Sequence, residues 1–284
     1  MLTILHASDL QFGKPFRPRA GDAFRSLAFE VMPDLIVVSG DLTQRAKPRE
    51  FKAAWDFLER LPRVPLVVTP GNHDVPLYRI WERAVTPFWR WRHHIPRDVD
   101  SVVRVAGSMI VGLNSASPYR AIVNGRIQRH QLAFARKAFD EVPPGGPRVL
   151  VVHHHFVSPP DGEGGAPLPG GRKILQEIED MQVDVVLSGH IHQTLIASSR
   201  DVIPGDRAGV PLIHTGTTTS RRGRGPEHRK NSCNIVKVLE DTIEVTPHFF
   251  ESHGSAFEPG ETVSVPRPGT PMKTAYPGAF PQED

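Results

Sequence analysis

The sequence predicts a layered α/β fold. Short runs rich in Val, Ile and Leu are apolar without alternation, which is typical of strands that are covered on both faces. Amphipathic helical patterns lie between several of these runs, and this alternation of strand and helix is characteristic of layered α/β proteins. The predicted strands are residues 2–7, 34–40, 64–71, 108–114, 148–154 and 183–189.

Three segments between these strands show the helical period. In residues 48–61 the apolar side chains fall on one face, and Pro48 suits the first turn of a helix. Residues 127–140 and 171–182 repeat the pattern. We therefore expect three amphipathic helices that pack their apolar faces against a sheet.

The character of the chain changes after about residue 193. Strand-like runs follow one another without helices between them, and we expect them to form a second sheet beside the first. The stretch 253–284 is rich in Pro and Gly and poor in apolar residues, which predicts a tail or arm. The sequence thus predicts a domain of residues 1–252 and a tail of residues 253–284, through which an oligomer could form.

Composition restricts the function classes. The chain has 284 residues, with 34 Lys and Arg against 31 Asp and Glu, which gives a net charge of +3. A dedicated nucleic-acid-binding protein would be expected to be much more basic. The single cysteine, Cys233, excludes an internal disulfide and a Cys-based zinc site. No apolar run approaches the roughly 18 residues of a membrane span, and no signal peptide is recognisable, so we expect a cytoplasmic protein.

Polar residues that can bind metals follow nearly every predicted strand of the first half. The carboxyl ends of strands in an open α/β sheet form the crevice where ligands bind, so these side chains are expected to meet at one point. Three of them follow a glycine, which allows a tight turn and close backbone approach. The candidates are Asp9, Asp41, Asn72, one histidine of 153–155, His190 and His192.

The types of ligand indicate the chemistry. Carboxylate and amide oxygens mixed with imidazole nitrogens suit Mn²⁺, Fe, Zn²⁺ or Ni²⁺ rather than Ca²⁺. A carboxylate can bridge two such ions about 3.5–4 Å apart, and paired ions serve phosphoryl chemistry. They lower the pKa of a bridging water, and the resulting hydroxide attacks phosphorus. The pattern therefore predicts a centre of two divalent metal ions.

Five motifs together resemble those of the calcineurin-like metallophosphoesterase superfamily. They are "HASDLQFG", "VVSGDLTQ", "VVTPGNHD", "VLVVHHH" and "LSGHIHQ". The resemblance covers roughly residues 2–250 and is strongest to the bacterial class III cyclic-nucleotide phosphodiesterase branch. It implies a four-layer αββα sandwich of two mixed β-sheets flanked by helices, with the metals at the sheet ends.

The resemblance also implies roles for the metal-binding residues. Asp9 and His192 would hold the first metal, and Asp41 would bridge the two. The second metal would be held by Asn72, His190 and a histidine of the triple run, for which the position after the strand favours His153, with His154 as the alternative.

Two further residues match parts of the family pattern that do not bind metal. His73 would polarise the phosphate or protonate the leaving oxygen, and Asp74 would orient His73 through a hydrogen bond. Gln11 departs from the pattern, because the family has a ligating histidine there. Its amide oxygen could ligate, which would favour Mn²⁺ or Mg²⁺ over Zn²⁺ and weaken binding, or the side chain could bind only a metal-bound water.

The function that these residues predict is metal-dependent hydrolysis of a phosphodiester, either a cyclic nucleotide or another small diester. One alternative is a larger substrate such as a nucleotide-linked lipid or the end of a nucleic acid. Another is a degenerate binding scaffold in which Gln11 marks lost catalysis. Residues 220–232 are expected to form a basic loop that could bind a second phosphate or a nucleic acid, or simply be solvated. Residues 81–94 predict an amphipathic helix with buried tryptophans or a cap over the pocket.

Overall fold

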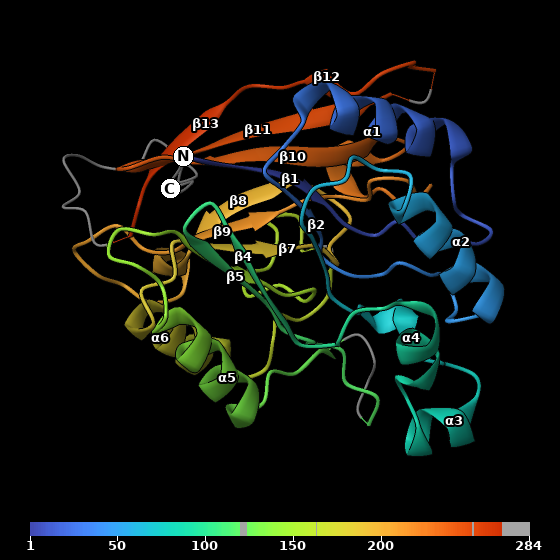
Figure 1. Ribbon diagram of the computed structural model, residues 1–284, viewed down its shortest axis with the longest axis horizontal. Helices are drawn as coiled ribbons and strands as arrows, with labels where there is room; N and C mark the ends of the chain where they lie inside the picture. Colours follow the sequence, from blue (N-terminus) through green and yellow to red (C-terminus); the bar gives the residue numbers. More distant parts are fainter. Residues whose placement is uncertain (120–123, 163, 252, 269–284) are drawn as a thin grey trace.

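A computed structural model describes residues 1–268, apart from 120–123, 163 and 252. Two mixed sheets lie face to face, with helices on the outer sides (Figure 1). This arrangement confirms the predicted four-layer αββα sandwich. The outer helices are α1 (Pro18–Val31) and α2 (Pro48–Leu58) on one side and α5 (Arg129–Phe139) and α6 (Gly171–Asp180) on the other.

The first sheet has the strand order β12-β11-β10-β1-β2-β3, and β13 also pairs with β11. β1, β2 and β3 are parallel, whereas β10 and β11 run antiparallel to their neighbours. The strands are β1 (Leu2–Ala7), β2 (Leu35–Val38), β3 (Leu66–Val68), β10 (Asn231–Val238), β11 (Thr242–Phe250), β12 (Glu258–Pro259) and β13 (Val263–Pro266).

The second sheet has the order β4-β5-β6-β7-β9-β8. Its four central strands are parallel, and the two edge strands are antiparallel. The strands are β4 (Ser101–Val105), β5 (Ser108–Gly112), β6 (Arg148–Val151), β7 (Val185–Ser188), β8 (Leu195–Ser198) and β9 (Pro211–His214).

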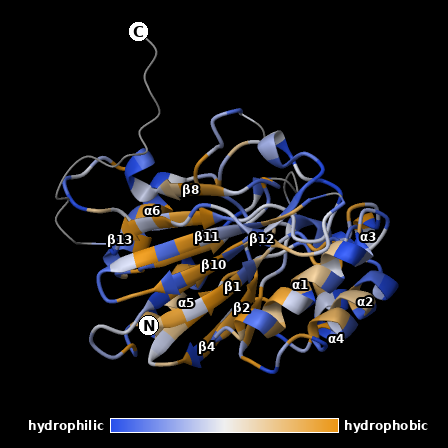
Figure 2. Cartoon of the chain, turned by 90° about the horizontal axis from the view of Figure 1, so that it is seen from above, coloured by the Kyte–Doolittle hydropathy of each residue, from blue (hydrophilic) through white to orange (hydrophobic). Residues whose placement is uncertain are grey.

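The core explains why the strands are apolar at every position. In β2, Leu35 and Val37 pack between the two sheets, whereas Ile36 and Val38 pack against the outer helices. Because alternate side chains of a strand point to opposite faces, a strand in this position needs an apolar residue at each step. Figure 2 shows the apolar strands of the sandwich in this layered arrangement.

The strands after residue 193 do not form a second sheet of their own, so this part of the prediction is wrong. β8 and β9 join β4–β7, whereas β10 and β11 extend the sheet of β1. The sequence could not separate these strands, because all of them are apolar and partner choice depends on the register of distant segments. β12 and β13 fall within the predicted tail of 253–284 and pair with β11. Residues 269–284 of that tail lie outside the described residues.

The segment 81–94 forms two short helices instead of one amphipathic helix. These are α3 (Ile80–Val85) and α4 (Trp89–His94). The expected burial holds for Trp91, which is fully buried, but Trp81 is 85% exposed and Trp89 52% exposed. No described helix is both long and apolar enough to cross a bilayer.

We predict that Trp91→Ala lowers the free energy of unfolding by about 3–5 kcal/mol, because it removes a buried aromatic side chain. The Trp91 indole N–H also donates to the carbonyl of Arg97 at 3.0 Å, and its ring meets Phe51 edge-on. Urea unfolding measures the change. Trp81→Ala is the matched control and should cost less than about 0.5 kcal/mol; equal losses in the two variants would contradict the described packing of α4.

Candidate metal centre

The chain turns sharply where the strands of the two sheets end, and most of the predicted metal ligands stand on these turns. Several have positive φ, a left-handed conformation that costs non-glycine residues roughly 1–3 kcal/mol and persists only where the surroundings impose it. The values are 51° at Asp9, 48° at Gln11, 53° at Asp41, 73° at His190 and 61° at His192.

At two of the glycines that precede predicted ligands, the neighbouring atoms leave no room for a side chain. A Cβ at Gly71 would lie 2.1 Å from Oδ1 of Asp41, and a Cβ at Gly189 would lie 1.8 Å from Oγ of Ser8. Both distances are far below van der Waals contact. The close backbone approach expected from the sequence is therefore confirmed at these two turns.

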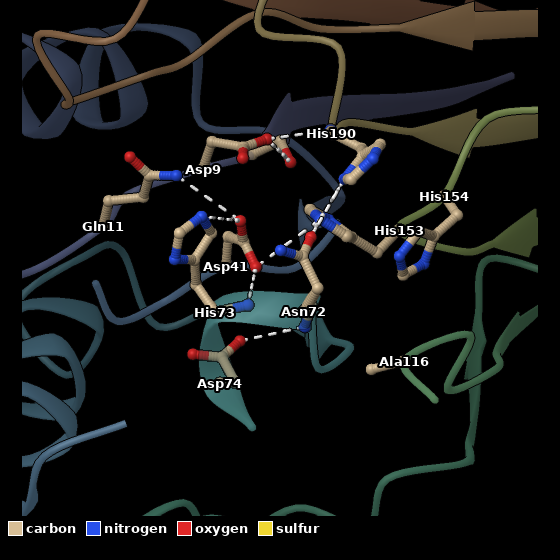
Figure 3. A network of polar contacts seen from close by, with 12 residues as sticks. Asp9, Gln11, Asp41, Asn72, His73, Asp74, Ala116, His153, His154 and His190 are labelled. Carbon is tan, nitrogen blue, oxygen red and sulfur yellow. Dashed lines mark hydrogen bonds and ion pairs between the residues drawn. The ribbon is translucent and has the colours of Figure 1, made fainter. Parts of the chain in front are cut away.

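Asp41 lies at the middle of the cluster (Figure 3). Its Oδ1 accepts the backbone N–H of His73 at 2.8 Å and lies 3.5 Å from Nε2 of His153. Its Oδ2 lies 3.4 Å from the amide nitrogen of Gln11. Ligand atoms of Asp9, Asp41 and His153 all lie within 4.8 Å of one another.

Asn72 brings the histidines together on one side of Asp41. Its Oδ1 lies 3.2 Å from Nε2 of His153 and 3.0 Å from Nδ1 of His190. The other two histidines of the triple run point elsewhere: Nδ1 of His154 contacts Ser115 Oγ at 2.8 Å, and Nε2 of His155 lies 3.3 Å from the carbonyl of Gly165. The geometry thus brings His153, rather than His154, to the cluster.

Asp9 and His192 meet on the other side. Oδ1 of Asp9 lies 3.0 Å from Nε2 of His192, and Oδ2 of Asp9 accepts the backbone N–H of His190 at 3.0 Å. The facing imidazoles of His192 and His153 lower the pKa of the Asp9 carboxyl even though its burial acts in the opposite direction. This carboxylate therefore stays ionised in the folded protein.

Gln11 presents its amide nitrogen to the centre. This nitrogen lies 3.4 Å from Nε2 of His192, while Oε1 accepts a hydrogen bond from Ser220 Oγ at 2.8 Å. The Ser220 hydroxyl can either donate or accept a hydrogen bond. If the Gln11 amide were turned by about 180°, it would therefore keep its bond to Ser220 and direct its oxygen to the centre. The side chain thus suits either of the two roles expected for it.

The imidazole tautomers test whether metal ions fit this cluster. Nδ1 of His153 lies 2.7 Å from the carbonyl of Ser39, and Nδ1 of His192 lies 2.8 Å from the carbonyl of Arg222. A carbonyl only accepts, so both Nδ1 atoms carry protons and both Nε2 atoms direct lone pairs inward. The lone pair of His153 faces Oδ1 of Asn72, and that of His192 faces Oδ1 of Asp9. A divalent cation bound between the two atoms of each pair would be ligated by both of them.

The electrostatics of His153 agree with a cation at this position. Burial lowers the pKa of this imidazole, but the carboxylates of Asp41 and Asp9 raise it more, so the net shift is upward. Positive charge is therefore favoured beside these carboxylates, and the residues present fit the two-metal centre that the sequence predicts.

His73 lies beside Asp41 but is held differently from expectation. Its Nδ1 lies 2.9 Å from the carbonyl of Gln44, whereas the expected hydrogen bond between His73 and the Asp74 carboxylate is not formed. The Asp74 carboxylate accepts from the backbone N–H groups of Leu42, Thr43 and Gly71. Burial and the nearby Asp41 raise the pKa of Asp74 to about 7. Asp74 thus organises the turn that carries Asn72 and His73, in η1 (Asn72–Asp74).

The basic loop reaches the centre through Arg222. Its Nη1 lies 2.9 Å from Nε2 of His73, and its backbone carbonyl accepts from His192. Sequence reasoning placed Arg222 and Ser220 in a basic loop and Gln44 in a motif without giving them a role at the centre, and it missed Ser115 altogether. The sequence does not reveal these contacts, because a hydroxyl or a backbone carbonyl carries no signal until the fold brings it to its partner.

Comparison with known proteins places the chain in a family. Residues 2–194 match the family model described as calcineurin-like phosphoesterase. The chain belongs to the calcineurin-like phosphoesterase family. It is 32% identical over 186 residues to a probable cyclic nucleotide phosphodiesterase of Synechococcus, covering 63% of this chain and 65% of the relative. It is 24% identical over 216 residues to a cAMP/cGMP dual specificity phosphodiesterase of Mycobacterium tuberculosis, covering 74% of this chain and 64% of that protein.

The chain thus spans a little under two thirds of the length of each of these two curated relatives. Solved structures agree on the fold. A purple acid phosphatase of yellow lupin superposes with a TM-score of 0.68 at 12% identity, covering 94% of this chain and 54% of the lupin chain. A dimetal phosphatase of Danio rerio gives 0.62 at 11% identity, covering 94% and 99% of the two chains.

Two histidines behind the candidate metal centre are buried. His6 contacts Ser39 Oγ at 2.9 Å, and His214 contacts Ser188 Oγ at 2.7 Å. Burial lowers the pKa of each to about 3, and for His214 the nearby His155 and His6 add to the effect. Both are neutral in the folded protein, whereas the same side chains titrate near pH 6.5 when unfolded.

We predict that the free energy of unfolding falls with decreasing pH between about pH 6.5 and 3, because the unfolded chain then binds more protons. Each histidine contributes about 1.4 kcal/mol per pH unit in the middle of this window. Urea unfolding at pH 5.5 and 4.5 in EDTA checks this, with His214→Asn lowering the slope by about that amount. An unchanged slope in this variant would show that His214 titrates normally in the folded state.

Proposed function

We propose that this phosphoesterase is a metal-dependent phosphodiesterase that hydrolyses small diesters, with 3′,5′-cyclic nucleotides as the first candidates. The observation that supports the proposal is the convergence of the whole predicted ligand set around Asp41, with His73 beside it. The names of the two curated relatives favour cyclic nucleotides among small diesters.

The proposed ligands fall into two groups that share Asp41. Asp9 and His192, with Gln11, would hold one divalent ion, and Asn72, His153 and His190 would hold the other. When bound, the ions would supply Lewis-acid activation of the phosphate and of the attacking water. The oxygen-rich first group favours Mn²⁺, with Fe, Zn²⁺ and Ni²⁺ as other candidates.

His73 and Arg222 are proposed to act on the substrate itself. Nδ1 of His73 donates to the Gln44 carbonyl, which leaves Nε2 to face the centre, 3.9 Å from Oδ2 of Asp41. Nε2 here accepts from Nη1 of Arg222, so it would first take up a proton from solvent once the guanidinium turns to the phosphate, and it would then pass that proton to the leaving alkoxide. The Arg222 guanidinium meets the same nitrogen and would bind a non-bridging phosphate oxygen that enters there. The cytoplasmic location and an oligomer formed through the tail stay predictions.

We expect Asn72→Ala to lower the rate of bis-p-nitrophenyl phosphate hydrolysis with Mn²⁺ by about 100-fold or more, since it removes the amide that joins His153 and His190. Absorbance of released p-nitrophenol measures the rate. Gln176→Ala, which removes an exposed amide from α6, is the control and should keep full activity. Equal, near-zero rates in wild type and Asn72→Ala would favour the non-catalytic scaffold instead.

Gln11→His should strengthen metal binding, because imidazole is a better ligand than a neutral amide for ions such as Zn²⁺. We expect the wild type to lose one metal on dialysis and to regain activity with Mn²⁺, and the variant to retain zinc about tenfold more tightly. Metal content by mass spectrometry after dialysis measures the difference. Two tightly bound zinc ions in the wild type, with no gain from Mn²⁺, would refute the loose first site.

A further inference from the structure

Helix α3 presents its apolar side chains to solvent. At about 100° per residue, Ile80, Trp81 and Val85 fall within one arc of about 140° around the helix axis. Ile80 and Val85 are each 73% exposed, and none of the residues of α3 is buried. In a helix that packs on a globular domain the apolar face would point to the core, so α3 has the opposite orientation.

The polar side chains of α3 attach the helix to the domain. Arg83 donates to the carbonyl of Pro118 at 2.6 Å, and Arg79, just before the helix, donates to the carbonyl of Ala46 at 2.7 Å. Glu82 accepts from Arg79 at 2.6 Å. The polar side of α3 therefore fixes its orientation, and the apolar side is left in contact with water.

The exposed apolar surface extends beyond α3. Half of the large apolar side chains that are exposed among the described residues lie within residues 77–89. Arg90 of α4 pairs with Glu82, which holds the two helices side by side at the margin of the molecule (Figure 1). Such a concentration of exposed apolar groups marks an interaction site. We call these six residues the apolar patch: Leu77, Tyr78, Ile80, Trp81, Val85 and Trp89.

The apolar patch lies beside the candidate metal centre, because the two carbonyls that hold α3 belong to loops of that centre. Ala46 is two residues from Gln44, whose carbonyl contacts His73. Pro118 is three residues from Ser115, whose hydroxyl contacts the triple histidine run. An object that covers the patch would therefore lie near the metal centre.

Positive charge accompanies the apolar patch. Residues 79–94 contain four arginines and one glutamate, so this segment has a formal net charge of +3, equal to that of the whole chain. Arg92 is exposed and forms no hydrogen bond or ion pair with any residue that the structure describes. It follows Trp89 by three residues and so lies on the same side of α4. The surface thus combines aromatic rings with uncompensated cations.

We propose that the apolar patch docks on the surface of a membrane that contains anionic lipids. The rings of Tyr78, Trp81 and Trp89 have an apolar body and a polar edge, which is typical of side chains at the boundary between head groups and acyl chains. The excess of arginine attracts anionic head groups. A second copy of the chain fits the patch less well, because a two-fold contact would bring the arginines of both copies together.

Docking adds a location to the proposed function without depending on it. The candidate metal centre would act close to a lipid surface, whichever diester it hydrolyses. The contact would be interfacial, since the helices that carry the patch have only six residues each.

Sedimentation with vesicles tests the proposal on the full chain. EDTA is present, so that no metal ion can join the protein to a lipid phosphate. The vesicles contain phosphatidylcholine alone or with about 30% phosphatidylglycerol. We expect the anionic vesicles to bind the wild type at least about tenfold more tightly than the neutral ones. Equal binding to both kinds, or binding to neither, would overturn the proposal.

Trp81→Ala/Trp89→Ala should weaken binding to the anionic vesicles by at least about tenfold, because it removes two rings that would enter the interface. The matched control is Phe29→Ala/Phe134→Ala, which removes two exposed rings from α1 and α5 and should bind like the wild type. Wild-type binding in the patch variant would overturn the proposal. The single variant Trp81→Ala provides the same comparison, with a loss of at least about threefold, if the double variant does not fold.

Light scattering distinguishes the membrane from a second copy of the chain. We expect the wild type and Trp81→Ala/Trp89→Ala to have the same mass in solution. A wild-type dimer that this variant converts to a monomer would overturn the proposal and assign the apolar patch to a subunit interface. Hydrolysis of bis-p-nitrophenyl phosphate without vesicles tests the proposed phosphodiesterase separately, since vesicle binding in EDTA does not require turnover.

Discussion

The left-handed turns at the strand ends are the constraint on which the rest of this structure depends. A strand that ran on, or turned through ordinary right-handed backbone, would carry Asp9, Asp41 or His190 away from the centre. Each turn is unfavourable by itself, so the fold must impose it. Hydrogen bonds between turns do this: Asp9 donates its N–H to the carbonyl of Gly40, and Gln11 donates to that of Asp41. The candidate metal ligands thus hold one another in place through their backbones.

The sandwich supplies the rigid frame for these turns. β1, β2 and β3 of one sheet and β6 and β7 of the other direct their carboxyl ends to the same edge, so the centre draws residues from both sheets. The apolar layer between the sheets fixes their relative position, because close-packed interiors deform little. The centre is therefore built by long-range packing, and the chain brings together residues as distant in sequence as Asp9 and His192.

The layered fold and the clustering of the candidate ligands could be predicted from the sequence because both depend on local signals. A buried strand followed by Gly-Asp or Gly-His is readable in a few residues. Prediction from the sequence failed where the partners of a segment are distant. It did not assign β8–β11 to the correct sheets, and it expected Asp74, instead of the Gln44 carbonyl, to support His73. It also failed for Trp81 and Trp89, since apolar character alone does not tell whether a neighbouring element covers a side chain.

Arg222 serves the centre with two chemically independent parts. Its backbone carbonyl fixes the tautomer of His192, and any residue type at this position would provide that carbonyl. Its side chain meets His73, and this contact depends on the guanidinium. Substitution of Arg222 would therefore remove the guanidinium from His73 while the backbone carbonyl that supports His192 stays in place. The side chain at this position can thus vary through evolution without disturbing the backbone that supports the candidate metal centre.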